Sequence, residues 1–268
     1  MIARTVLVMV SIASIAMPTT APPSPPPGDT YAMIVSGIGK DPEDRLARDQ
    51  IVRDLSSYLL EKALVRPDRL TVLVPGADAV GSSTADRVAE TIRVYASAMA
   101  PADRFVLYYA GQANAIGESL RLNLPGADIT QGDLAKWLAG LKAGVQLVVL
   151  DCPYAAVAAR ALARPGRVIV LASAAEQAHA TRFGLHFVPA LARAQSDTDR
   201  DGRVSALEAF VAAAREIETW YQDRQLLPTE TASIEDNGDG RPSERPWRYE
   251  QDGDDGRLAA GLVLAPEG

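Results

Sequence analysis

The chain is 268 residues long and 47% of its residues are apolar, which is enough to bury the core of one large domain or two small ones. Its net charge is −7, with 34 acidic and 27 basic residues, and the arginines are scattered rather than clustered, so we expect no nucleic-acid partner. A single cysteine excludes an intrachain disulfide, and the fold therefore depends on packing, with or without a metal.

The N-terminus is predicted to be a secretory leader followed by a stiff linker. Arg4 precedes the apolar run TVLVMVSIASIAM, which ends at small residues and proline. This run is shorter than the ~18–20 residues that a membrane span needs, so residues 1–21 are interpreted as a signal peptide that is cleaved after Ala16 or after Ala21. The segment PPSPPP indicates a proline-rich linker over residues 22–30. We therefore expect a periplasmic or secreted protein without a membrane span after removal of the leader.

Residues 31–226 alternate between strand-like and helix-like segments. Apolar runs near residues 31, 68, 103, 145 and 167 are typical of buried strands, and the segments between most of them have helical periodicity. Ser83 or Thr84 is the expected N-cap of the second helix, and residues 120–130 are expected to form a loop or short hairpin. This order predicts an α/β fold with a doubly wound, mostly parallel sheet and helices on both faces. Because such sheets bind ligands outside the carboxyl ends of their strands, a peptide or protein ligand is expected at that edge.

Residues 197–208, DTDRDGRVSALE, have the spacing of an EF-hand calcium loop. Calcium takes oxygen ligands from positions 1, 3, 5, 7, 9 and 12 of such a loop, and glycine at position 6 permits the sharp turn. These positions are held by Asp197, Asp199, Asp201, Arg203 through its carbonyl, Ser205 through a water, and Glu208, with Gly202 at the turn. Apolar residues at helical spacing on both sides predict the helix–loop–helix context. We therefore expect a Ca²⁺ site, and a solvated turn is the alternative.

The tail, residues 227–268, is rich in Asp, Gly and Pro and contains only part of a second calcium loop. Glu235, Asn237 and Asp239 have the spacing of positions 1, 3 and 5, but position 12 is Pro246, which has no carboxylate. A solvated coil is expected, with an auxiliary calcium contact as the alternative. With one complete loop in the sequence, a structural calcium site is favoured over a sensor that opens an apolar groove.

The order of the elements and two strand ends resemble the caspase-like cysteine peptidases, which include caspases, metacaspases and legumain. In that family one strand ends in Gly-His-Gly, which carries the catalytic histidine, and the next ends in Asp-x-Cys-x-Ser-Gly, which carries the nucleophile. Here the two strands read FVLYYAGQA and VVLDCPYAA. The segments YAMIVSGIG and NLPGADIT look like a bacterial branch related to legumain. The resemblance spans about residues 31–221 and implies a caspase-like fold.

The resemblance also shows where the peptidase pattern is degenerate. It places Gln112 at the histidine position, and an amide cannot accept a proton from a thiol. If Asp151 is the family aspartate, the nucleophile position is Pro153, with Cys152 one residue early. Ala155 and Ala156 replace the Ser-Gly that forms part of the family's oxyanion hole.

Two functional hypotheses follow from these departures. The first is a calcium-binding pseudopeptidase that acts as a binding or scaffold module, with no catalytic residues expected. The second is an active cysteine endopeptidase in which Cys152 attacks with His179 or His186 as its base, because a nucleophilic thiol needs a base within hydrogen-bond reach.

Overall fold

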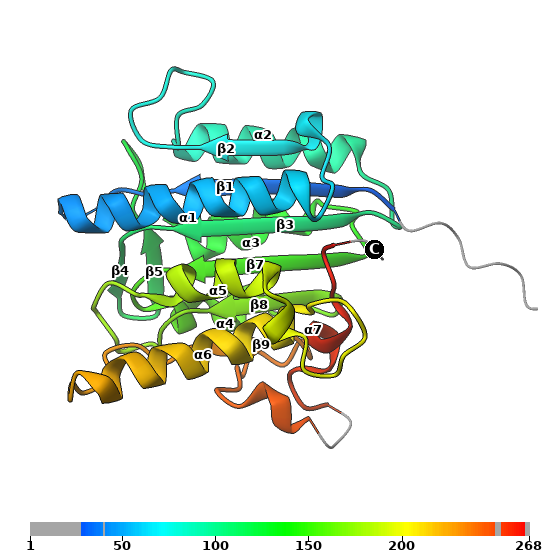
Figure 1. Cartoon of the computed structure of the whole chain (residues 1–268). Helices are drawn as coiled ribbons and strands as arrows, with labels where there is room; N and C mark the ends of the chain where they lie inside the picture. The colour runs from blue at the N-terminus through cyan, green and yellow to red at the C-terminus, as the bar shows by residue number, and fades with distance from the viewer. Residues whose placement is uncertain (1–27, 40, 250–252, 266–268) are drawn as a thin grey trace, which may run out of the picture.

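The computed structural model describes residues 28–39, 41–249 and 253–265 (Figure 1). The predicted leader, residues 1–21, and most of the predicted linker lie outside the described residues. In chain order the helices and strands are β1 (Thr30–Ser36), α1 (Pro42–Glu61), β2 (Leu70–Leu73), α2 (Ala85–Ala98), β3 (Arg104–Ala110), β4 (Ala113–Ile116), β5 (Ser119–Leu122), β6 (Ile129–Thr130), α3 (Gln131–Ala139), β7 (Val145–Asp151), α4 (Ala159–Leu162), β8 (Arg167–Leu171), α5 (Phe183–Ala192), α6 (Ala206–Asp223), β9 (Ser233–Glu235) and α7 (Arg257–Gly261).

A six-stranded sheet with the order β2-β1-β3-β7-β8-β9 forms the centre of the molecule. The first five strands in this order pair in parallel, and β9 pairs antiparallel with β8. The register aligns Ser36 with Ala110 and Ala110 with Asp151, so β1, β3 and β7 end at the same edge. The predicted α/β fold with a mostly parallel sheet is therefore confirmed.

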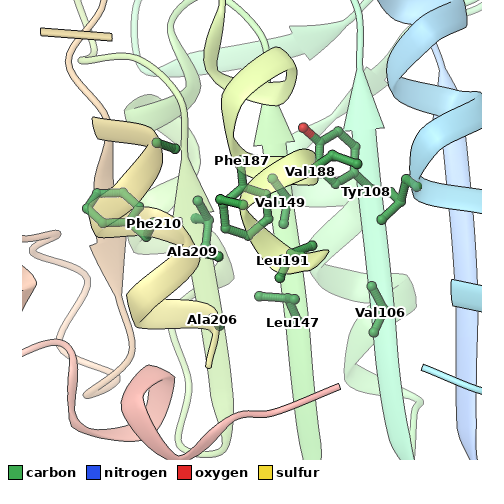
Figure 2. Close-up of a cluster of buried hydrophobic side chains, with 14 of the residues drawn as sticks. Val106, Tyr108, Leu147, Val149, Phe187, Val188, Leu191, Ala206, Ala209 and Phe210 are labelled. Atoms are coloured by element: carbon green, nitrogen blue, oxygen red, sulfur yellow. The ribbon is translucent and has the colours of Figure 1, made fainter. Parts of the chain in front are cut away.

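Helices cover both faces of the sheet, as the unbroken apolar strands predict. On one face, α1, α5 and α6 bury their apolar sides against alternate residues of β3 and β7, including Val106 and Val149 (Figures 1 and 2). On the other face, α2, α3 and α4 pack against the intervening residues, including Leu107 and Val148. Because side chains alternate along a strand, neighbouring residues of one strand lie in different cores.

Local capping fixes where two of these helices begin. Thr84, rather than Ser83, is the N-cap of α2, and its hydroxyl accepts the N–H of Arg87. Thr130 and Asp133 form a capping box that starts α3, in which each side chain bonds to the other's backbone. The segment expected to be a loop or hairpin contributes β5 and β6 to a separate three-stranded antiparallel sheet with β4.

The tail differs from the predicted solvated coil. Ser233–Glu235 form β9, which is the last strand of the central sheet, and Ile234 is completely buried among residues that pack on α6. The expectation of a coil is wrong here, because three residues that precede an Asp- and Gly-rich segment are too few to show a strand period. The strand forms because the edge of β8 offers unpaired backbone groups. No helix within the described ranges is long and apolar enough to cross a bilayer.

Candidate metal centre and peptidase positions

The predicted calcium loop lies between two packed helices. Phe183 and Phe187 of α5 stack with their ring centroids 5.0 Å apart, and Phe183 lies 5.9 Å from Phe210 of α6. These aromatic contacts fix α5 and α6 against each other, so the chain between them must turn within a short span. The helix–loop–helix context that the apolar spacing predicts is therefore present in the structure.

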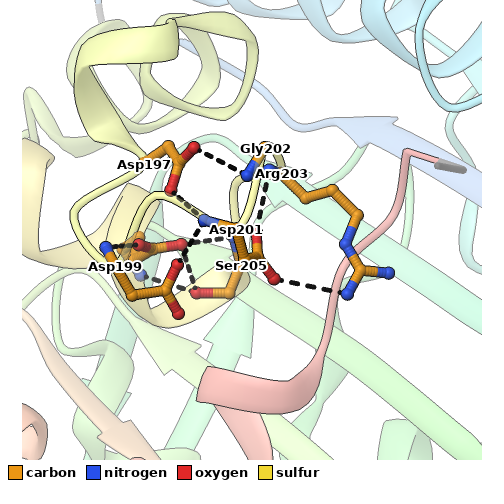
Figure 3. Close-up of polar contacts among 7 residues, drawn as sticks. Asp197, Asp199, Asp201, Gly202, Arg203 and Ser205 are labelled. Carbon is orange, nitrogen blue, oxygen red and sulfur yellow. Dashed lines mark hydrogen bonds and ion pairs between the residues drawn. The ribbon is translucent and has the colours of Figure 1, made fainter. Parts of the chain in front are cut away.

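The first half of the loop is folded around its own carboxylates (Figure 3). The carboxylate of Asp197 accepts the N–H groups of Asp201 and Gly202 at 3.2 and 3.0 Å, and Asp199 Oδ1 accepts the N–H of Asp201 at 3.0 Å. Asp201 Oδ1 accepts the N–H of Arg203 at 2.8 Å. Gly202 has φ +87°, a left-handed conformation that glycine adopts without strain. The sharp turn expected at position 6 is thus confirmed.

Glu208 closes the loop from the first turn of α6. Its Oε1 accepts the N–H groups of Thr198 and Asp199 at 2.7 and 3.2 Å, and its Oε2 accepts the N–H of Ser205 at 2.9 Å. Burial alone would raise the pKa of Glu208, but these backbone hydrogen bonds outweigh it and hold the pKa below its usual value. Glu208 is therefore ionised at neutral pH, as a calcium ligand must be.

The structure brings together part of the predicted ligand set. Oxygen atoms of Asp197, Asp199 and Glu208 all lie within 4.8 Å of one another. Asp201 is exposed, and its Oδ2 lies 3.3 Å from Nη2 of Arg203. Ser205 caps α6 in a capping box with Glu208. The group supplies only oxygen donors, which suits a hard cation such as Ca²⁺, and calcium binding itself remains a prediction.

The structure places Cys152 and His186, one of its two candidate bases, on opposite sides of the sheet. Cys152 is completely buried on the sheet face covered by α2, α3 and α4, and burial raises the pKa of its thiol well above the ordinary value. His186 is on α5, which packs on the opposite face, and its Nδ1 lies 2.8 Å from Oε2 of Glu216. His179 is exposed on the connection between β8 and α5. The sheet therefore stands between Cys152 and His186.

The remaining degenerate positions lie at the carboxyl edge of the sheet. The amide of Gln112 donates to Asp44 Oδ2 at 3.0 Å, and Pro153 is buried. Gln112 also lines a cavity of about 40 Å³, together with Asp44, Arg48, Asp151 and Thr181. This volume holds only a few water molecules. A peptide or protein ligand at this edge stays a prediction.

Two buried carboxyl groups near this edge receive hydrogen bonds from neighbouring elements. Asp151 accepts the hydroxyls of Thr181 and Tyr108 at 2.5 and 3.0 Å, and burial raises its pKa to about 6. Glu230 accepts the N–H of Arg182 at 2.7 Å, and burial raises its pKa to about 7. The sequence singled out Asp151 through the peptidase resemblance, but Glu230 gave no signal because it lies in the tail that was expected to be coil.

The chain is similar to known proteins in structure but not in sequence. No protein-family model matches the chain, and no curated protein matches its sequence. Among solved structures, the chain is similar to a secreted C11 cysteine protease from Bacteroides thetaiotaomicron, determined in complex with an irreversible peptide inhibitor. The identity is 12%, the match covers 77% of this chain and 66% of that chain, and the TM-score is 0.41. A similarity this weak assigns neither a family nor an activity to this chain.

Proposed function

We propose that this protein is a calcium-binding module on a caspase-like α/β scaffold, with Ca²⁺ bound in the loop of residues 197–208. The observation that carries the proposal is the group of carboxylate oxygens from Asp197, Asp199 and Glu208, which lie within 4.8 Å of one another. Three carboxylates so close together repel one another, and a divalent cation bound between them offsets this repulsion by attracting each of them. The full set of EF-hand positions in the sequence supports calcium over other hard cations.

The proposed role of the metal is structural. Asp197 follows α5, whereas Glu208 stands in the first turn of α6, so an ion bound by both links the two helices. An ion that binds only the folded state stabilises it by RT ln(1 + [Ca²⁺]/Kd). We assign the protein to the periplasm or the cell exterior on the strength of the predicted leader, in compartments where calcium is plentiful.

The proposal also includes the loss of peptidase chemistry. A thiol acts as a nucleophile only as the thiolate and only beside a base, and Cys152 has a raised pKa with His186 beyond the sheet. Gln112 cannot serve as the base. The protein is therefore proposed to act through binding, as a scaffold or as a receptor for a peptide or protein.

Thermal unfolding with and without calcium tests the structural role. Millimolar Ca²⁺ is expected to raise the Tm of the chain lacking residues 1–21 by several degrees relative to the chelated protein, since each kcal/mol shifts Tm by roughly 2–4 °C at this size. In the Asp197→Asn/Glu208→Gln variant we expect most of this increase to be lost. Asp223→Asn, an exposed change at the far end of α6, is the matched control and should respond as the unchanged chain does. Equal responses in all three proteins would refute the proposal.

Thiol labelling tests the absence of peptidase chemistry. Cys152 is expected to react with an alkylating reagent only after the protein is unfolded, because its side chain is completely buried. Rapid labelling of the native protein, together with peptide cleavage that Cys152→Ala abolishes, would establish the active peptidase instead.

A further inference from the structure

A second segment repeats the fold of the calcium loop. Residues 235–241, EDNGDGR, begin at the last residue of β9 and align by position with residues 197–203, DTDRDGR. At position 1, Asp197 accepts the N–H of Gly202 at 3.0 Å, and Glu235 Oε1 accepts the N–H of Gly240 at 3.1 Å. In both segments the first side chain therefore bonds to the backbone of the glycine at position 6.

The agreement continues through positions 3 and 5. Asn237 Oδ1 accepts the N–H of Asp239 at 2.8 Å, as Asp199 Oδ1 accepts that of Asp201. Asp239 Oδ1 accepts the N–H of Arg241 at 2.7 Å, as Asp201 Oδ1 accepts that of Arg203. Positions 4 and 6 are left-handed in both segments, with φ of +62° and +87° in the first loop and +87° and +76° in the second.

The carboxylate missing at position 12 is supplied by a residue further along the chain. In the first loop, Glu208 accepts the N–H groups at positions 2 and 3. In the second, Asp255 Oδ1 accepts the N–H groups at the same positions, from Asp236 at 2.9 Å and Asn237 at 3.3 Å. Asp236 accepts the N–H groups of Gly256 and Ala259, each at 2.8 Å, which holds Asp255 beside the loop. The folded chain thus supplies a carboxylate for position 12, where the linear spacing of the sequence supplies none.

A buried oxygen without a partner points to a ligand in this loop. Glu235 is completely buried, and its Oε1 accepts the N–H groups of Gly238 and Gly240 from inside the turn. Its Oε2 has no hydrogen-bond partner among the described residues. Such an oxygen is costly to bury unless a hydrogen bond or a cation satisfies it. Asn237 Nδ2 donates to the carbonyl of Gly253 at 2.5 Å, which leaves its Oδ1 facing the loop.

We propose that Glu235, Asn237, Asp239 and Asp255, with the carbonyl oxygen of Arg241, form a second Ca²⁺ site. All the donors are oxygens, which excludes a preference for the metals that nitrogen and sulfur ligands select. The set carries three carboxylates, whereas the first loop carries four. The buried guanidinium of Arg167 is close enough for its charge to interact with that of Glu235, although no ion pair joins them among the described residues. Both features make the second site the weaker one, since ligand charge tunes calcium affinity.

Calorimetric titration with Ca²⁺ separates the two sites. The unchanged chain is expected to bind two ions, and the Asp197→Asn/Glu208→Gln variant is expected to bind one. Adding Asp239→Asn to that variant should weaken the remaining site at least about tenfold, because the neutral amide removes one of the three carboxylates. Asp239 is exposed, so this change leaves the core intact, and adding Glu244→Gln, an exposed change in the same tail, is the control that should leave the affinity unaltered.

The outcomes distinguish this proposal from that for residues 197–208. If the Asp197→Asn/Glu208→Gln variant binds no calcium, or if Asp239→Asn does not weaken its binding, the second site is refuted while the first can stand. If Asp239→Asn/Asp255→Asn in an otherwise unchanged chain binds no calcium, the site at residues 197–208 is refuted instead. Circular dichroism of each variant confirms that the fold is retained.

Discussion

At the residue scale, burial sets the pKa of two carboxyl groups, those of Asp151 and Glu230. The hydrogen bonds from Thr181 and Tyr108 lower the pKa of Asp151, but desolvation dominates and leaves it at about 6. The same balance leaves Glu230 at about 7, and the nearby charge of Asp151 adds to the increase. Both groups therefore lose protons within the neutral range, well above the usual values near 4.

These pKa values make the folded state more stable at mildly acidic pH. Above about pH 7 both carboxyls are ionised in the folded and unfolded chains, so the cost of burying their charges is fully present. As the pH falls through 7 and 6 the folded chain binds protons that the unfolded chain does not yet bind, so the free energy of unfolding rises. An increase of about two in pKa corresponds to roughly 3 kcal/mol for each group. We expect the Tm to be several degrees higher at pH 5 than at pH 8 in chelator.

The Glu230→Gln variant provides the control for this pH dependence. Its neutral side chain can still accept the N–H of Arg182, so we expect a higher Tm than that of the unchanged chain at pH 8 and a smaller change between pH 8 and 5. Thermal unfolding followed by circular dichroism measures both effects. A Tm that falls between pH 8 and 6 in the unchanged chain would contradict the pKa assignment.

At the element scale, the pairing of α5 with α6 positions the calcium loop. Phe187 is almost completely buried, and its ring stacks on that of Phe183. Ser205 is the N-cap of α6, two residues after Arg203, and its capping box with Glu208 fixes the side chain that closes the loop. The loop therefore depends on the helices for its ends and on its own carboxylates for its internal turns.

Truncating the aromatic contact should loosen this pair of helices. Phe187→Ala is expected to lower the free energy of unfolding by about 3–5 kcal/mol, because it removes a large buried side chain and leaves a cavity. Leu226→Ala, at a position that is 52% exposed, should change it by no more than about 0.5 kcal/mol. Urea denaturation with calcium chelated measures both variants. A loss below about 1 kcal/mol for Phe187→Ala would show that the helices do not depend on this contact.

At the scale of the whole molecule, the tail belongs to the same folded unit as the sheet. β9 covers the edge of β8, and further on the N–H of Ala206, at the start of α6, donates to the carbonyl of Leu262 at 2.8 Å. Ser205 and Val263 also form an antiparallel bridge. The chain after β9 therefore leads from the loop of residues 235–241 to the end of the loop of residues 197–208.

A chain that stops at Leu226 is accordingly expected not to fold stably. It lacks β9 and exposes the edge of β8, and an unpaired edge strand in a hydrophobic sheet favours association. We expect a loss of soluble monomer in size-exclusion chromatography and a loss of cooperative unfolding, with the chain of residues 22–268 as the reference. A soluble monomer with the reference midpoint would show instead that the tail is dispensable.

The sequence by itself determined the alternation of strands and helices and the loop of residues 197–208. Both are local signals, because apolar periodicity and the ligand spacing of a single loop are each read within one continuous segment. Gly202 illustrates this, since a glycine at position 6 predicts the left-handed turn without reference to the rest of the chain.

Only the tertiary structure decided the contacts between distant segments. Cys152, which follows β7, lies in one core, whereas α5, which carries His186, packs in the other, and the sequence does not say which core each helix covers. β9 pairs with β8, and Glu230 contacts Tyr221 of α6. No pattern in the tail's own sequence predicts either contact. Asp255 reaches residues 235–241 through hydrogen bonds that α7 and Asp236 organise, so the twelfth position, which is Pro246 along the chain, is filled through space by another residue.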